Sequence, residues 1–268
     1  MNREETRLFA IRLEVLPGKT LMEKFSNAEV YGFDAVELPG RYLQDYYQEL
    51  LACRKKLPLP VSSISLGYRG SLLSKDENVR KQCRDDIKSL LDLCSVLGAI
   101  GLVMPPALFK DNHQCFTGSE GDKILLGQLP ELAEYASGKT VHLMLEPVNS
   151  DETEYLTTLE HAVRLCESVN NPGLAITADW FHMHKEEMNM AIALRRCGKW
   201  LKHFHISESP GRTEPTPGGL DFKVAFDVLN EIGYKGYAVL ECRCLTGLAE
   251  TVLPTSLAYL KNLARRSL

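Results

Sequence analysis

The sequence predicts an α/β fold in which eight parallel strands alternate with helices and close into one (β/α)8 barrel. Short runs rich in apolar and β-branched residues alternate with amphipathic segments along the whole 268-residue chain. Parallel strands need crossover connections, which are usually helices. Four of the apolar runs also end in a carboxylate or an imidazole, at intervals of one strand–helix unit. In a barrel such strand ends meet at one rim.

The eight expected strands share a content of Val, Ile, Leu and Phe that favours extended structure. They are expected at 8–15, 34–39, 60–67, 99–104, 141–148, 174–180, 201–207 and 237–243. A doubly wound open sheet is the alternative arrangement, but it normally has a GxGxxG turn after its first strand, and LEVLPGKTL has none. No linker interrupts the pattern, so residues 1–268 are expected to form a single domain.

The helices are expected between these strands and after the last one. The clearest helical patterns cover 78–97, 157–169, 221–232 and 250–266. Gly32, Gly98 and Gly233 follow helical segments, where a left-handed C-cap is expected. The longest irregular stretches, 105–121 and 208–220, both follow strands and are therefore expected on the catalytic face of the barrel.

Composition and charge argue against several classes of function. A net charge of −4 provides no basic surface for nucleic acid, and no apolar run is long enough to span a membrane. The start, MNREETRLFAIRL, has no secretory signal region. Cys94 and Cys166 occupy apolar positions of expected helices, which is typical of reduced, buried thiols. We expect a cytoplasmic protein without nucleic-acid or membrane partners.

Four residues at the ends of consecutive apolar runs are candidate metal ligands. The runs VHLMLE, LAITAD, LKHFH and YAVLE end at Glu146, Asp179, His205 and Glu241, with spacings of 33, 26 and 36 residues. Any one of them alone would more often be a helix cap or a solvated charge. Charges on the inner side of a strand are costly unless they are paired or bind a metal. Three carboxylates and one imidazole suit one divalent metal, Mn²⁺ or Mg²⁺, with Co²⁺ or Zn²⁺ as alternatives.

The segments around these residues resemble a known family. EPVNSDE at 146–152, ADWFHMH at 178–184, HFHISESPGR at 203–212 and LEC at 240–242 resemble the metal motifs of the xylose isomerase-like TIM-barrel superfamily. The chain is most similar to the sugar isomerase and epimerase branch, typified by D-tagatose 3-epimerase and hydroxypyruvate isomerase. GFDAVEL at 32–38 resembles the second-strand signature of that group.

The resemblance implies a divalent-metal-dependent isomerase or epimerase of a small sugar or keto-sugar. In this family the reaction proceeds by proton abstraction through a metal-bound enediolate. Glu146, Asp179, His205 and Glu241 then resemble the metal ligands, and Glu146 and Glu241 also resemble the two catalytic glutamates that take and return the proton. A metal is needed because a carbonyl α-proton is too weakly acidic for an unaided carboxylate.

Three further residues resemble substrate contacts of the family. His182 resembles a residue that polarises a substrate oxygen, although a surface-loop histidine is the alternative. Arg212 resembles an arginine that holds a substrate oxygen, and its guanidinium could bind a hydroxyl, a carboxylate or a phosphate. Glu152 resembles a substrate-contacting acid, with a solvated charge before a helix as the alternative. His184 and His203 are weaker candidates, and a packing or supporting role is expected for His203.

Two other functions remain open on the sequence alone. An inosose-type dehydratase or lyase could use the same metal site, and a non-catalytic sugar-binding barrel could keep the same fold. Abasic-site DNA cleavage, known in the same superfamily, is disfavoured because the early strands PVSSISLGY and GLVMPPALF contribute no histidine. The family also suggests a homodimer or homotetramer. Which sugar binds, and whether it is free or phosphorylated, cannot be read from the sequence because loop shape decides it.

Overall fold

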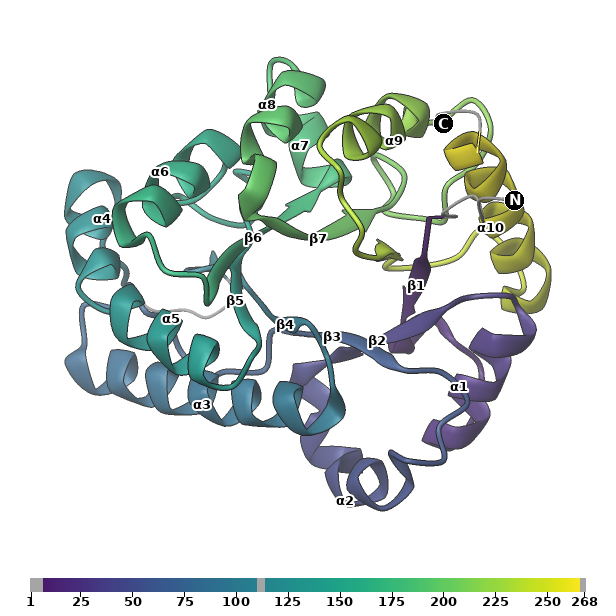
Figure 1. Cartoon of the computed structure of the whole chain (residues 1–268), viewed down its shortest axis with the longest axis horizontal. Helices are drawn as coiled ribbons and strands as arrows, with labels where there is room; N and C mark the ends of the chain where they lie inside the picture. The colour runs from purple at the N-terminus through teal and green to yellow at the C-terminus, as the bar shows by residue number, and fades with distance from the viewer. Residues whose placement is uncertain (1–6, 110–113, 266–268) are drawn as a thin grey trace.

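The computed structural model describes residues 7–109 and 114–265 and contains a closed barrel of parallel strands surrounded by helices (Figure 1). The strands pair in chain order, and β1 pairs with β8 to close the barrel. Each strand lies within a range expected from the sequence. The strands are β1 Phe9–Arg12, β2 Ala35–Pro39, β3 Val61–Ser65, β4 Gly101–Met104, β5 His142–Leu145, β6 Leu174–Asp179, β7 Leu201–Ile206 and β8 Ala238–Leu240.

The helices form the outer layer of the molecule in Figure 1. The α-helices are α1 Leu21–Val30, α2 Leu43–Cys53, α3 Glu77–Leu97, α4 Gly118–Leu126, α5 Leu129–Gly138, α6 Leu159–Val169, α7 Trp180–Glu186, α8 Met190–Cys197, α9 Phe222–Glu231 and α10 Ala249–Arg265. Short 3-10 helices include η1 Leu13–Val15, η2 Gly40–Tyr42 and η4 Gly198–Trp200. The four clearest helical patterns of the sequence correspond to α3, α6, α9 and α10, and residue 266 lies outside the described residues. The expected left-handed C-cap is present at Gly98, where φ is 70°.

Two boundaries differ from the sequence-based expectation. The first strand ends at Arg12, and η1 follows because the N–H of Leu16 bonds to the carbonyl of Leu13. The stretch 105–121 is not wholly irregular, since α4 begins at Gly118; residues 110–113 lie outside the described part. Glycines at 118 and 121 lower helix propensity, and that is why the sequence pattern concealed the start of this helix.

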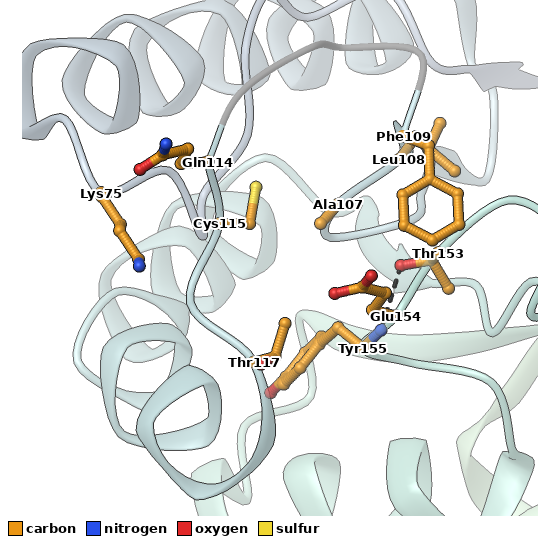
Figure 2. A pocket seen from close by; sticks show the side chains of 10 residues that line it. All are labelled: Lys75, Ala107, Leu108, Phe109, Gln114, Cys115, Thr117, Thr153, Glu154 and Tyr155. Carbon is orange, nitrogen blue, oxygen red and sulfur yellow. Dashed lines mark hydrogen bonds between the residues drawn. The ribbon is translucent and has the colours of Figure 1, made fainter.

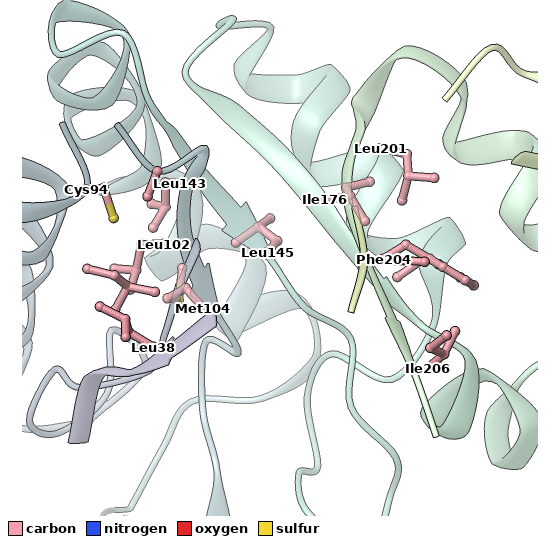
Figure 3. Close-up of a cluster of buried hydrophobic side chains, with 14 of the residues drawn as sticks. Leu38, Cys94, Leu102, Met104, Leu143, Leu145, Ile176, Leu201, Phe204 and Ile206 are labelled. Carbon is pink, nitrogen blue, oxygen red and sulfur yellow. The ribbon is translucent and has the colours of Figure 1, made fainter. Parts of the chain in front are cut away.

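Strand alternation separates the barrel interior from the outer core. Leu143 and Leu145 of β5 belong to the large core between strands and helices, part of which is shown in Figure 3. Met144 between them faces inward, where it packs with Val103 and Ala175. This period of two is the ordinary consequence of strand geometry. The interior of the barrel is therefore apolar near the strand starts.

The inward-facing positions become polar toward the strand ends. On β6, Ala175 is followed inward by Thr177 and Asp179, and all three are buried. On β7 the corresponding inward residues are His203 and His205, which pair in register with Thr177 and Asp179. The fold thus gathers buried polar groups at the carboxyl end of the barrel, where barrel active sites lie. No described helix has the length and apolar character required to cross a membrane.

Candidate metal and catalytic site

Four of the predicted site residues converge at the ends of four adjacent strands. Asp179 is the last residue of β6 and His205 lies near the end of β7, while Glu146 and Glu241 directly follow β5 and β8. One ligand atom from each residue lies within 4.8 Å of the others, and all four residues are buried. This arrangement arises because neighbouring parallel strands bring their carboxyl ends to one rim.

The ring of His205 lies at the centre of this cluster. Its Nδ1 atom is 2.9 Å from Glu146 Oε1 and 2.9 Å from Glu241 Oε2. The Nε2 atom points the other way, toward Glu37 of β2, at 3.0 Å from Oε2. The two nitrogens of one imidazole therefore serve two different groups of residues.

Two arginines, buried Arg212 and half-buried Arg12, contact the same carboxylates. The Arg212 guanidinium donates through Nη2 to Asp179 and to Glu241, and Arg12 donates through Nη1 to Glu241. The buried carboxylates of this region are Glu37, Glu146, Asp179 and Glu241. When all four carboxylates are ionised, the two guanidinium groups neutralise two of their negative charges. Two negative charges are then left without a partner charge. One divalent cation would balance these two charges, so the donor set and its charge both fit such an ion.

Burial and charge move the pKa values of the cluster in opposite directions. Burial raises the pKa of Glu146 to about 7. Burial alone would also raise the pKa of Glu241, but the neighbouring Arg212, His205 and Arg12 hold it well below its ordinary value. Desolvation and nearby charges are the usual causes of such shifts. Shifted pKa values are concentrated in this cluster, and such a concentration is typical of functional sites.

A cavity of about 330 Å³ opens beside the cluster. Its volume falls within the range of small-molecule sites, about 300–1,000 Å³. Its walls include Glu146, Glu241 and the three predicted substrate contacts, Glu152, His182 and Arg212. The structure therefore brings the four candidate ligands and the three candidate substrate contacts to one cavity or its ligand cluster. His184, the weaker candidate, is exposed on α7.

His182 is buried in this wall rather than exposed on a loop. Its Nδ1 atom accepts hydrogen bonds from the backbone N–H of Asn149 at 3.0 Å and from the Asn149 side-chain amide at 2.7 Å. Its Nε2 atom lies 2.9 Å from Arg212 Nη1, and a guanidinium can only donate. Burial lowers the pKa of His182 to about 3, and the Arg212 charge adds to this effect. A neutral imidazole and a guanidinium thus lie in contact with each other in the cavity wall.

Glu152 lies at the edge of the cavity and is partly exposed. Its Oε1 atom accepts a hydrogen bond of 2.5 Å from Arg243, which follows β8. Both residues line the cavity. The Glu152–Arg243 ion pair therefore links the segment after β5 to the segment after β8 at the edge of the cavity.

Three residues of the site, two of them buried and Arg12 half-buried, were not among the sequence candidates for ligands or substrate contacts. Glu37 and Arg12 belong to the early strands β2 and β1, and Ser63 belongs to β3. A charged residue inside the apolar run AVELP was the available signal for Glu37. His203, expected to support the site, lies 2.7 Å from Glu37 Oε2 and 3.1 Å from His205 Nε2.

A second cavity, of about 390 Å³, lies next to the first. The two share Leu108 in their walls, and the second is lined mainly by residues of 107–109, 114–117 and 153–155. Figure 2 shows the rings of Phe109 and Tyr155 and the side chain of Glu154 around it. The larger cavity lacks the buried carboxylate cluster. We therefore assign the chemistry to the smaller one.

The fold agrees with comparisons to known proteins. Residues 25–263 match the family described as xylose isomerase-like TIM barrel. Over 250 residues the chain is 29% identical to 3-dehydro-D-guloside 4-epimerase of Escherichia coli (strain K12), and this alignment covers 91% of the chain and 95% of that protein. It is also 29% identical over 236 residues to D-psicose 3-epimerase of Enterocloster bolteae, covering 83% of the chain and 76% of the relative.

Solved structures give the same result for the architecture. The apo crystal structure of 3-keto-D-glucoside 4-epimerase from E. coli has a TM-score of 0.84 at 28% identity, and the match covers 96% of this chain and 99% of that one. D-psicose 3-epimerase from Clostridium cellulolyticum H10, solved with D-tagatose, has a TM-score of 0.83 with the same coverage of both chains. Its identity is 19%, so this second likeness concerns the fold alone.

Proposed function

The chain belongs to the xylose isomerase-like TIM barrel family, and we propose that it is a divalent-metal-dependent sugar epimerase that inverts a carbon next to a carbonyl group. Its relatives place it among the sugar isomerases and epimerases. The observation that carries the finer proposal is the pair of buried glutamates, Glu146 and Glu241, at one cavity with Asp179 and His205.

The names of the relatives suggest a shared reaction. In a 3-dehydro sugar the carbonyl is at C3, and a 4-epimerase acts at the neighbouring carbon. In a ketose such as psicose the carbonyl is at C2, and a 3-epimerase again acts at the neighbouring carbon. The hydrogen on such a carbon is acidified by the carbonyl. We therefore infer that the substrate is a keto-sugar.

The two glutamates supply the proton transfers in this proposal. Glu146 follows β5 and Glu241 follows β8, so their carboxylates reach the cavity from strands that are separated by β6 and β7. One carboxylate takes the proton from the carbon and leaves an enediolate, and the other delivers a proton to the opposite face. Inversion follows because removal and return occur on different faces. A positioned carboxylate is a suitable general base when it lies within hydrogen-bond reach of the proton.

The remaining residues hold the substrate and the cation. Glu146, Asp179, His205 and Glu241 would hold the divalent ion, and Mn²⁺ or Mg²⁺ suits three oxygen donors and one nitrogen. When bound, the ion would stabilise the negative charge that develops during proton removal. His182 and Arg212 line the cavity in contact with each other, and their side chains would bind sugar oxygens. Glu152 would accept from a sugar hydroxyl at the cavity edge.

Deuterium incorporation tests this proposal directly. The chain loaded with Mn²⁺ would be incubated in D₂O with free ketoses, phosphorylated ketoses and 3-keto-glycosides, and the products would be followed by NMR. We expect an epimer with one deuterium at the carbon next to the carbonyl. Product without deuterium would indicate internal hydride transfer, and would leave the glutamates as ligands only. Elimination of a hydroxyl would indicate a dehydratase instead.

Substitution of the glutamates completes the test. Glu146→Gln and Glu241→Gln keep the shape of the side chain and remove the proton acceptor. Loss of a general base lowers turnover by about 10²–10⁴-fold. Glu167→Gln, on the exposed face of α6, is the matched control and should keep native turnover. Sugar binding without turnover in the native chain would favour a non-catalytic barrel.

A further inference from the structure

A second buried polar group lies beneath the ligand cluster, inside the barrel. It consists of Glu37 from β2, Ser63 from β3 and His203 from β7, each 0% exposed. The Oε2 atom of Glu37 is 2.7 Å from Ser63 Oγ, 2.7 Å from His203 Nε2 and 3.0 Å from His205 Nε2. A single carboxylate oxygen therefore receives three groups from two other strands, β3 and β7.

To bind a cation, His205 must keep the lone pair on one particular ring nitrogen, and Glu37 can enforce this. The His205 Nδ1 atom faces Glu146 and Glu241, and it can bind a cation only through a lone pair. A neutral ring with its lone pair on Nδ1 carries its proton on Nε2. That proton then needs a buried acceptor, because an orphaned buried N–H is costly. Glu37 Oε2 is in the position of this acceptor.

We propose that Glu37 is a positioning residue for the metal site, which fixes the proton of His205 on Nε2 and turns Nδ1 toward the cation. This inference rests on the proposed function. Metal-binding histidines generally donate their other ring N–H to a carboxylate or carbonyl, and this contact sets the tautomer and the ring orientation. Glu37 is well placed to do so although it is 168 residues from His205 in sequence.

Ser63 and His203 hold Glu37 in this orientation. The Ser63 hydroxyl donates to Glu37 Oε2, and His203 contacts the same oxygen through Nε2. Among the described residues the Nδ1 atom of His203 has no hydrogen-bond partner. The ring is therefore best accommodated with its proton on Nε2 and an unprotonated Nδ1, since buried N–H groups are left unpaired less readily than acceptors. His203 then acts as a second donor to Glu37.

The same three residues, Glu37, His203 and His205, could in principle hold a cation of their own. Two features favour the positioning role. The Ser63 hydroxyl already donates to the carboxylate oxygen that would ligate the ion. In addition, His205 would need to lose both ring protons to bind one cation through Nδ1 and another through Nε2. If Glu37 only positions His205, the chain binds one cation at these residues. If Glu37 is itself a ligand, the chain binds two.

Metal affinity is the appropriate measurement, because a merely structural role would not change it. The full chain would be treated with a chelator and titrated with Mn²⁺, with free Mn²⁺ followed by EPR and Co²⁺ absorption used to report coordination geometry. Loss of such a supporting group typically weakens metal binding by about 10–100-fold. We expect this loss in Glu37→Ala, a smaller one in Glu37→Gln, and the smallest in Ser63→Ala. The amide oxygen of Gln can still accept from His205, but it is uncharged.

Thr177→Val is the matched control for these variants. Thr177 is buried inside the barrel, pairs in register with His203, and its hydroxyl makes no hydrogen bond to the described residues. It should therefore keep native Mn²⁺ affinity. Ser63→Ala and Glu37→Gln keep the test valid if Glu37→Ala does not fold, since both nearly preserve the shape of the core.

The outcomes separate this inference from the proposed function. Native affinity in Glu37→Ala and Glu37→Gln would overturn the positioning role alone. Two Mn²⁺ ions per native chain, with one lost in Glu37→Gln, would also overturn it, because Glu37 would then be a ligand. A native chain that binds none of Mn²⁺, Mg²⁺, Co²⁺ or Zn²⁺ would overturn the metal-dependent function itself, and this inference with it.

Discussion

At the scale of single residues, Arg212 connects the candidate ligand cluster to the cavity beside it. Its guanidinium contacts Asp179 and Glu241 through Nη2 and His182 through Nη1. Its backbone φ is 54°, a value that residues other than glycine seldom adopt. Hydrogen bonds hold this conformation, from the Arg212 N–H to the Glu208 carbonyl and from the Arg243 N–H to the Arg212 carbonyl. Such local strain, supported by its surroundings, is common in functional sites.

We predict that Arg212→Lys lowers kcat/KM while the chain still binds Mn²⁺. A lysine ammonium keeps the charge but cannot reach Asp179, Glu241 and the substrate oxygen with the geometry of a planar guanidinium. Loss of one hydrogen bond to a charged group costs about 1.5–3 kcal/mol, which corresponds to roughly 10–150-fold in rate. Steady-state kinetics and Mn²⁺ titration measure the two effects separately. Arg195→Lys, in an exposed ion pair on α8, is the control, and native kinetics in Arg212→Lys would show that the guanidinium fork is not used.

The sequence predicted the site residues that could be recognised locally. Glu146, Asp179, His205 and Glu241 each end an apolar run, and the repeat of this pattern implied that they meet. Glu37 and Arg12 carried weaker signals because their significance depends on contacts across the barrel. Glu37 is 166 residues from His203, and only closure of the barrel brings them together. The tautomer of His205 likewise depends on a partner that no local pattern reveals.

At the scale of elements, the segment 208–220 after β7 positions Arg212. Glu208 is buried at its start, where its two carboxylate oxygens accept from the backbone N–H groups of Thr216 and Leu220 at 3.0 and 2.9 Å. The chain therefore folds back on itself around one carboxylate. Gly219 makes this possible, because a Cβ atom there would lie 2.1 Å from Glu208 Oε1.

We predict that Gly219→Ala both destabilises the chain and lowers its activity. The added Cβ would displace the Glu208 carboxylate and leave two backbone N–H groups without their acceptor. Thr216 is exposed and Leu220 half-buried, so the cost is that of a lost hydrogen bond to a charged acceptor, at most about 1.5–3 kcal/mol each. Arg212 would shift with the segment, and a displacement of about 1 Å in a catalytic site can cost 10²-fold in rate. Denaturant unfolding and kinetics together measure these effects.

Gly138→Ala is the control for this substitution. Gly138 ends α5, and a Cβ atom there would meet nothing within 4 Å. Alanine at that position should leave kcat/KM unchanged and should not lower stability, because glycine is the poorer helix former. Native stability and activity in Gly219→Ala would mean that Glu208 does not hold the segment.

Element positions were predictable where the periodicity was strong, and their ends were less so. All eight strands were expected, since each is a short buried run between helical segments. The early end of β1 at Arg12 depends on the turn of η1, and the start of α4 is concealed by two glycines. These boundaries follow from backbone hydrogen bonds that a hydrophobic pattern does not encode.

At the scale of the whole molecule, the ligand cluster joins four consecutive strands of the closed barrel. Glu146, Asp179, His205 and Glu241 come from β5 to β8, which together form half of the wall. The three carboxylates among them, when ionised, hold like charges close together, opposed by Arg12 and Arg212. A cation bound there would therefore attach these strands to one another, and unfolding of the barrel would have to release it.

We predict that divalent metal raises the unfolding temperature of the entire chain. A ligand that binds only the folded state, at a free concentration of about 100 times its Kd, adds about 2.7 kcal/mol to the free energy of unfolding. For a chain of this size the change corresponds to roughly 5–10 °C in Tm. Calorimetry of the chelator-treated chain, with and without Mn²⁺, measures this increment.

Asp179→Asn identifies the origin of that increment. The amide can still accept at Oδ1 from the Phe181 N–H, which caps α7, so the helix start is preserved while one charged ligand is lost. The metal-dependent rise in Tm should then largely disappear, whereas Glu167→Gln on the exposed face of α6 should retain it. An equal rise in the native chain and in Asp179→Asn would place the stabilising ion elsewhere on the molecule. In that case the cluster at the barrel rim would not be the site that binds the stabilising ion.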